Sequence, residues 1–324
     1  FTDREIEQTK AVIQNQMLET LDTSRGLTEV LYHNVISKTN ITDDMWIEGI
    51  NNTTKEDIVQ VAQKIDLDTV YFLSGMEAWS LEKIEIRQLQ EELYYEQLPN
   101  GLDVYILPKA GFHKTYVTFT TKYGSIDNEF VPQGATEFKK VPDGIAHFLE
   151  HKLFEKEDGD VFQQFSQQGA SANAFTSFTR TAYLFSATKN VEENLKTLID
   201  MVQTPYFSEK TVEKEKGIIG QEIQMYNDNP DWRLYFGTIE NMYHYHPVKI
   251  DIAGTIESIA QITEKLLYEC YHTFYHPSNM LLFICGPVDV ENMIELIRND
   301  QEERGFTKQP EIKRRVVDEP LSVH

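Results

Sequence analysis

Three residues, His147, Glu150 and His151, have the types and the spacing of a metal site. On an α-helix, residues four apart share a face with Cβ atoms about 5–6 Å apart, so two imidazoles can bind one zinc ion at Zn–N distances of about 2.0–2.1 Å. Glu150 directly precedes the second histidine, so its carboxylate can reach a water on the metal rather than the metal itself. This H-x-x-E-H order reverses the commoner H-E-x-x-H motif. It predicts hydrolysis assisted by Zn2+, with the two histidines as ligands and Glu150 as the general base.

A third ligand should come from another element, because catalytic zinc sites usually have three protein ligands and leave a fourth position for water. The segment from Glu209 to about Tyr226 contains strong helix formers and few breakers, which predicts a long helix. It offers Glu213, Glu215 and Glu222. Glu215 and Glu222 are two helical turns apart and share a face, so one could bind the metal while the other orients a ligand. The spacing alone does not rank these carboxylates.

The elements around these residues predict an α+β fold. Residues from about 144 to 154 should form a short helix, and alternating apolar residues predict strands before and after it. The expected strands are 102–107, 115–123, 172–177, 181–188 and Met280–Gly286, and the expected later helices are 191–202 and 209–226. Nearer the start, amphipathic helices are expected at 3–21 and from Thr54, and a strand at Thr69–Gly75. Successive strands followed by helices indicate a sheet layer covered by helices.

Composition limits the classes of function. The 324 residues carry a formal net charge of −22, which argues against nucleic acid as a partner and favours cationic peptides. No run approaches the ~18–20 apolar residues of a membrane span, so no membrane is expected as a partner. Cys270 and Cys285 predict neither a disulfide framework nor a thiolate metal site. The first residues show no secretory signal, so a cytoplasmic location is the default for a chain that begins at Phe1 without an initiator Met.

Several motifs in the right order resemble the M16 metallopeptidases, the family of pitrilysin, insulin-degrading enzyme and the mitochondrial processing peptidase. The resemblance extends from about Glu91 to the end of the chain. Besides the H-x-x-E-H motif, it is carried by Leu98–Leu102, Tyr123–Ser125, Ala172–Thr176, Glu215–Glu222, Gly254–Ile259 and Tyr275–Met280. It implies a zinc-dependent endopeptidase that hydrolyses peptides or small unfolded polypeptides. It also implies a two-layer domain whose mainly antiparallel sheet is covered by helices.

The same resemblance assigns the remaining site residues. In the M16 family the third zinc ligand is the later glutamate of a pair seven residues apart, which here is Glu222. Its predecessor, Glu215, matches the accessory carboxylate of the catalytic site. The family pattern also places Ala172, Asn173 and Ala174 on an edge strand that pairs with the bound peptide. The physics agrees, because adding an extended substrate to a sheet edge gives main-chain hydrogen bonds without demanding a particular sequence.

The resemblance also suggests an unusual order of parts, closest to the paired bacterial M16 proteins. Residues 1–75 resemble the C-terminal tail of a second M16-like subunit, although in the family the zinc domain normally opens the polypeptide. Residues 76–97 are expected to be a charged connecting segment, 98–300 the zinc-bearing peptidase domain, and 301–324 a linker whose following domain is absent. We therefore expect a partial second domain of the same type, joined by a gene fusion or a truncated reading frame. The neighbouring genomic sequence tests this hypothesis.

Two functions stay open on the sequence. The first is a metalloendopeptidase that is incomplete as this chain alone and needs a second M16-type half or subunit. The second is a non-catalytic peptide-binding or assembly subunit of an M16-type complex. Structural zinc sites normally fill all four positions with protein ligands and need no adjacent base, so the intact motif favours the enzyme. Four other histidines are expected to have structural or pocket-wall roles rather than to form a second metal cluster: His244, His246, His272 and His276.

Overall fold

The computed structural model describes residues 42–63, 81–86, 91–157 and 159–319, together with separate positions between 6 and 14. The chain divides into two compact units, Phe1–Met76 and Glu77–His324.

The described residues of the first unit are helical except residues 42, 53 and 54. The described positions between 6 and 14 are helical, and α3 (Asp43–Asn52) and α4 (Lys55–Gln63) follow. Helix α4 confirms the helix predicted from Thr54, whose Oγ1 accepts a hydrogen bond from the Asp57 N–H at 3.2 Å. The predicted strand Thr69–Gly75 lies outside the described residues.

The second unit is built on a seven-stranded sheet with the order β1-β2-β3-β11-β4-β10-β9. Its strands are β1 (Glu82–Ile86), β2 (Glu91–Gln97), β3 (Asp103–Pro108), β4 (Thr115–Thr121), β9 (Ala170–Thr176), β10 (Thr181–Ala187) and β11 (Met280–Gly286). Neighbouring strands are antiparallel except β3 and β11, which are parallel. Alternate residues of β11 are buried, as expected of a strand with helices packed against the sheet. The α+β class and the mainly antiparallel sheet are therefore confirmed.

Strands β1 and β2 lie where the sequence predicts only a charged connecting segment, and here the structure differs from the expectation. The two strands pair antiparallel, with Ile84 opposite Leu93. Lys83 Nζ lies 2.6 Å from Glu92 Oε1, so the charged side chains contact each other across the pair. Apolar residues alternate with these charges, and both Ile84 and Ile86 are half-buried. The high charge content conceals the two-residue period of the strands.

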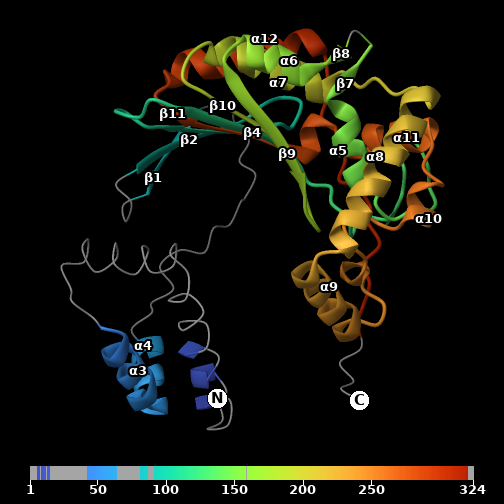
Figure 1. The fold of residues 1–324 in the computed structure, drawn as a ribbon. Helices are drawn as coiled ribbons and strands as arrows, with labels where there is room; N and C mark the ends of the chain where they lie inside the picture. The colour runs from blue at the N-terminus through green and yellow to red at the C-terminus, as the bar shows by residue number, and fades with distance from the viewer. Residues whose placement is uncertain are drawn as a thin grey trace. The chain divides into compact units, whose positions relative to one another are not determined.

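Helices cover the sheet in two groups (Figure 1). Helices α6, α7 and α12 lie over one face, whereas α5, α8, α10 and α11 gather beside β9. Their bounds are α5 (Ile145–Leu153), α6 (Val161–Gln167), α7 (Val191–Gln203), α8 (Glu209–Asn227), α9 (Pro230–Met242), α10 (Ile256–Ile259), α11 (Glu264–Phe274) and α12 (Val290–Arg304). Short ribbons are formed by β5 (Glu129–Phe130) with β6 (Lys139–Lys140) and by β7 (Glu155–Lys156) with β8 (Gly159–Asp160). None of the described helices combines the length and the apolar character needed to cross a bilayer.

The tail predicted to be a linker makes specific contacts with the second unit. Helix α12 continues to Arg304, and beyond it Arg314 forms an isolated antiparallel bridge with Phe130. Further on, the Glu319 carboxylate accepts hydrogen bonds from the N–H groups of Tyr245 at 2.9 Å and His246 at 2.7 Å. The described part of the tail is thus held by the body of this unit.

A pair of glycines sets the start of α5. Gly144, which precedes the helix, has φ +87°, and a Cβ there would lie 2.4 Å from the carbonyl oxygen of Ala253. Gly254 has φ +73°, and its Cβ would lie 2.5 Å from the carbonyl oxygen of Asp143. Ser258 Oγ donates to the same Asp143 oxygen at 2.8 Å. The two turns therefore meet backbone to backbone, and this close contact fixes where α5 begins.

Gly144→Ala should destabilise the metal-free protein more than Gly111→Ala, which is its matched control. Gly111 has nearly the same φ, +86°, but a Cβ there has no described atom within 4 Å outside its chain neighbours. Gly111→Ala should therefore cost only the left-handed backbone penalty of about 1–2 kcal/mol, whereas Gly144→Ala should cost about 1–3 kcal/mol more through overpacking. Urea unfolding measures both. An equal loss in the free energy of unfolding for the two variants would show that the contact with residue 253 does not affect stability.

Candidate metal centre

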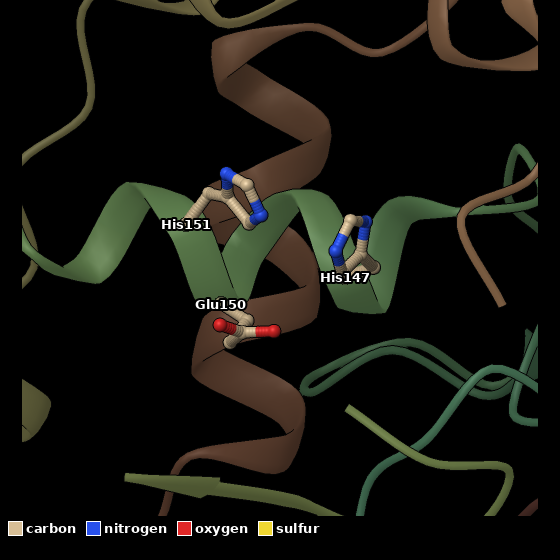
Figure 2. A group of neighbouring side chains, drawn as sticks. All are labelled: His147, Glu150 and His151. Atoms are coloured by element: carbon tan, nitrogen blue, oxygen red, sulfur yellow. The ribbon is translucent and has the colours of Figure 1, made fainter. Parts of the chain in front are cut away.

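Helix α5 brings His147, Glu150 and His151 together. Their ligand atoms all lie within 4.8 Å of one another, and the two imidazole centroids are 4.6 Å apart. Figure 2 shows the three labelled side chains along the helix. His147 and Glu150 are each only 8% exposed. Polar groups this deeply buried require partners, because an unpaired charge is costly away from water.

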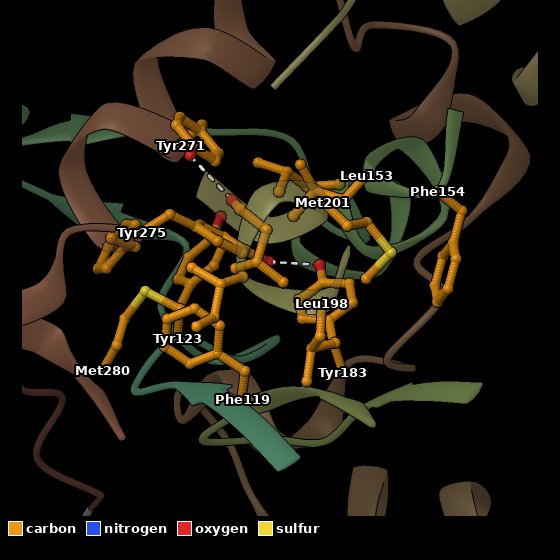
Figure 3. Packing of buried hydrophobic residues seen from close by; sticks show 14 of the residues in the cluster. Phe119, Tyr123, Leu153, Phe154, Tyr183, Leu198, Met201, Tyr271, Tyr275 and Met280 are labelled. Carbon is orange, nitrogen blue, oxygen red and sulfur yellow. Dashed lines mark hydrogen bonds between the residues drawn. The ribbon is translucent and has the colours of Figure 1, made fainter. Parts of the chain in front are cut away.

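The inner side of α5 is anchored in the hydrophobic core. Leu153, at the last turn, packs in the same cluster as Phe154 and Tyr183, and Figure 3 shows these residues beside Met201 and Leu198 of α7. The core also contains a hydrogen bond of 2.8 Å between the hydroxyls of Tyr183 and Tyr275. Core packing on one side of a short helix fixes its rotation, so the opposite residues present a defined constellation.

Helix α8 places a carboxylate, that of the predicted ligand Glu222, beside both histidines. Glu222 Oε2 lies 3.7 Å from His147 Nε2 and 3.5 Å from His151 Nε2. Ligand atoms at the corners of a tetrahedron with metal–ligand distances of 2.0–2.1 Å lie roughly 3.3–3.4 Å apart. The carboxylate oxygen is therefore spaced from each imidazole nitrogen nearly as zinc ligands are, and the donor set of two imidazoles and a carboxylate fits zinc. Glu213 instead forms an ion pair of 2.6 Å with Lys216 on the exposed side of α8.

Glu215 lies next to one of the histidines rather than at the shared point. Its Oε1 is 3.0 Å from His151 Nδ1, so the ring can donate its proton there and keep the Nε2 lone pair for a metal. Burial lowers the pKa of His151, but the bond to Glu215 and the surrounding carboxylates outweigh burial, so the net pKa is raised. The seven-residue spacing of the two glutamates left open which of them orients a ligand. In the structure, Glu215 makes the hydrogen bond to His151.

His147 differs electrostatically from its neighbour. Burial, followed by the charge of His151, lowers the pKa of His147 to about 4. The ring is therefore neutral at pH 7 and able to act as a donor to a metal. Its Nδ1 is buried and finds no hydrogen-bond partner among the residues that the structure describes. Of the two rings, only that of His151 is oriented by a described neighbour.

Glu150 is held by a residue that the sequence reasoning did not single out. Thr176, the last residue of β9, donates from Oγ1 to Glu150 Oε2 at 3.0 Å. Burial raises the pKa of Glu150, which makes the carboxylate a stronger base. Thr176 belongs to the Ala172–Thr176 motif, but neither its type nor its position in the sequence identifies it as the partner of Glu150.

A second group that the sequence reasoning missed lies beyond Glu222. Tyr226 Oη donates to Glu222 Oε1 at 2.8 Å, and burial, together with this bond, raises the pKa of Tyr226 to about 12. Trp232 stacks on the Tyr226 ring and donates from Nε1 to Asp251 Oδ2 at 2.6 Å. The four-residue spacing between Glu222 and Tyr226 on a predicted helix is the one signal that could have revealed this contact.

The residues Ala172, Asn173 and Ala174 lie on β9, which is the edge strand of the sheet. Two cavities meet at this strand beside Glu150 and His151. A cavity of about 670 Å³ extends toward α6 and the β7–β8 ribbon. One of about 320 Å³ extends toward Trp232 and is also lined by His147, Glu222 and Tyr226. The edge strand therefore runs alongside the candidate metal site, with hollow surface on both sides.

The other four histidines do not form a second cluster in the described part of the chain, where His147, Glu150 and His151 are the only such group. His246 Nδ1 accepts the Val248 N–H at 3.2 Å, and His276 Nδ1 accepts the Ser278 N–H at 3.1 Å. Both rings therefore cap short turns, as their predicted structural role requires. Cys270 and Cys285 are free thiols.

Two protein-family models match the chain. The model described as insulinase (peptidase family M16) matches residues 130–256, and the model described as the M16 inactive domain matches residues 261–322.

Two curated proteins of Bacillus subtilis are similar to different extents. "Uncharacterized zinc protease YmfH" is 73% identical over 243 residues, which cover 75% of this chain and 57% of that protein. "Probable inactive metalloprotease YmfF" is 49% identical over 80 residues, which cover 25% of this chain and 19% of that protein.

Solved structures share the fold. An M16-like peptidase from Alicyclobacillus acidocaldarius has a TM-score of 0.69 and 46% identity, over 73% of this chain and 55% of that one. A Helicobacter pylori protease has a TM-score of 0.61 at 23% identity, over 71% of this chain and 55% of that one, a likeness of fold alone. The chain thus spans little more than half the length of YmfH and of both solved structures. The matched models, the relatives and the shared fold confirm the resemblance of the motifs: the chain belongs to the M16 peptidase family.

Proposed function

We propose that this chain is the zinc-bearing half of an endopeptidase that hydrolyses peptides or small unfolded polypeptides. The observation that carries the proposal is that Glu222 Oε2 lies 3.7 Å from His147 Nε2 and 3.5 Å from His151 Nε2, with Glu150 grouped with the two histidines. Membership of the M16 family and the similarity to a protein named a zinc protease support it.

In this proposal the residues of the site have separate roles in metal binding and proton transfer. His147, His151 and Glu222 hold the ion, and Glu215 keeps the His151 ring in the tautomer that offers Nε2. Bound zinc would supply a water of lowered pKa and polarise the scissile carbonyl. Glu150 accepts the proton of the attacking water and delivers it to the departing amine nitrogen as the C–N bond breaks. Thr176 holds one Glu150 oxygen, so the other is directed to this proton transfer.

The substrate is proposed to bind as an added strand along β9. Ala172, Asn173 and Ala174 would contribute main-chain hydrogen bonds, which select an extended backbone and not a sequence. The position of β9 at the sheet edge and the two cavities beside it support this role. The formal net charge of −22 favours cationic peptides among the possible substrates.

We infer further that the working enzyme contains a second M16-type half. The chain covers 57% of YmfH, and a further B. subtilis relative, YmfF, is named a probable inactive metalloprotease. The aligned lengths of 243 and 80 residues together nearly equal the 324 of the chain. This supports the hypothesis that the two compact units derive from two different M16-like proteins. A second half would enclose the peptide and hold it near Glu150, and positioning of this kind contributes several kcal/mol to catalysis.

His147→Ala, His151→Ala and Glu222→Ala should each remove most of the zinc, which should otherwise bind at close to one ion per chain. Two remaining ligands hold zinc poorly, because protein zinc sites rely on three or four. Metal analysis of the purified variants measures the effect, and Glu213→Ala is the matched control on the same helix. Full zinc retention by the Glu222 variant would move the third ligand to another residue, with Glu215 first in line.

Glu150→Gln should keep zinc and lose hydrolysis in any preparation that shows activity. The amide preserves the size of the side chain but cannot accept the water's proton, and a general base contributes about 10²–10⁴-fold. Turnover of an unstructured basic peptide, at matched zinc occupancy, is the measurement. Glu213→Gln should behave as the unsubstituted chain. Comparable turnover by the Glu150 variant would rule out this residue as the base.

The isolated chain should show little peptidase activity even with zinc bound, and an added M16-type partner half should restore it. The reason is that an open zinc site leaves the peptide unpositioned and exposed to bulk water. The assay compares the chain with and without the partner at equal zinc occupancy. Strong activity of the isolated monomer would contradict the need for a second half.

A further inference from the structure

Tyr226 makes a contact with the candidate metal site to which the proposed reaction assigns no role. It lies one helical turn after Glu222 on α8, and its Oη donates to Glu222 Oε1 at 2.8 Å. The other oxygen, Oε2, is the one that lies near the Nε2 atoms of His147 and His151. The hydroxyl thus occupies one carboxylate oxygen and leaves its partner directed at the histidines.

The Tyr226 ring is itself fixed by a different helix. Trp232, in the first turn of α9, stacks on it with centroids 4.6 Å apart and an interplanar angle of 17°. Trp232 is held in turn by its bond to Asp251 and by a ring contact with Phe236 at 5.0 Å. The hydroxyl therefore has a defined position before it meets Glu222.

A glutamate carboxylate needs such a restraint. Its terminal torsion joins a tetrahedral carbon to a planar group, so it has a broad rotational profile and either oxygen can face the metal. The Glu222 side chain is 21% exposed, more than the 10% of His147. His151 is oriented by Glu215, and Glu222 is oriented by Tyr226.

We propose that Tyr226 is a positioning residue of the zinc site, whose hydroxyl holds Glu222 so that Oε2 alone meets the metal and thereby slows the loss of zinc. This inference rests on the proposed function, because it takes His147, His151 and Glu222 as the ligands. Groups that orient metal ligands commonly change metal affinity by about 10–100-fold when they are removed.

The test is Tyr226→Phe in the full chain, which keeps the ring and its stacking on Trp232 but removes the donor. Zinc release into excess chelator, followed with a zinc-sensitive dye, should be about 10–100-fold faster than in the unsubstituted chain, and affinity should fall in proportion. Urea unfolding of the metal-free variant should be unchanged. Tyr235→Phe, which removes the hydroxyl of an exposed residue of α9, is the matched control and should release zinc at the original rate.

A second variant tests how much Trp232 contributes to the position of the Tyr226 hydroxyl. Trp232→Phe keeps an aromatic face but loses the bond to Asp251, so it should speed zinc release less than Tyr226→Phe does. Equal release by the Tyr226 and Tyr235 variants would overturn the inference, as would a loss of metal-free stability that parallels the loss of affinity. Absence of zinc from the unsubstituted chain, or full zinc occupancy in Glu222→Ala, would instead show that the proposed ligands are wrong. The proposed function would then fail as well.

Discussion

The candidate site depends on one constraint: side-chain atoms from two helices, α5 and α8, must be held close together at a partly buried point. His147 and His151 are fixed relative to each other by one turn of α5, but their relation to Glu222 depends on how α5 and α8 pack. The glycine turn before α5 and the core beneath its last turn therefore determine the geometry of the site. A small rotation of this short helix would move both imidazole rings relative to Glu222 at once.

The charges of the site oppose one another in the absence of an ion. Glu150 and Glu215 are each 8% exposed, and a buried carboxylate is stable only with compensating partners. His151, whose pKa is raised, supplies part of that compensation, whereas His147 remains neutral. A divalent cation would complete the balance and compete with the proton on His151. The same arrangement that favours the metal therefore leaves the metal-free centre electrostatically strained.

The sequence predicts the features that arise from local periodicity, and it misses those that depend on the packing of distant segments. The H-x-x-E-H helix, the long glutamate helix and the alternating strands each have a period that a short window reveals. Glu215 and Glu222 share a face of α8, so the choice between them depends on where along α8 helix α5 packs, and only family resemblance could suggest it. Thr176 and Tyr226 lie next to Glu150 and Glu222 only after folding. In β1, exposed charged residues alternate with isoleucines and conceal a strand pattern, and in β2 charged residues occupy even half-buried and buried positions.

Asn173 gives the edge strand a property of its own. Its Oδ1 accepts the N–H of Ala174 at 2.9 Å, so a main-chain donor of β9 already has a side-chain acceptor. An unpaired strand edge invites association with any other extended chain, including another copy of the protein. A peptide that uses this donor must displace the asparagine amide, exchanging one amide carbonyl for another at little net cost. The strand can thus remain at an exposed edge without acting as a ready template for aggregation, while a peptide with further contacts can still displace the side chain.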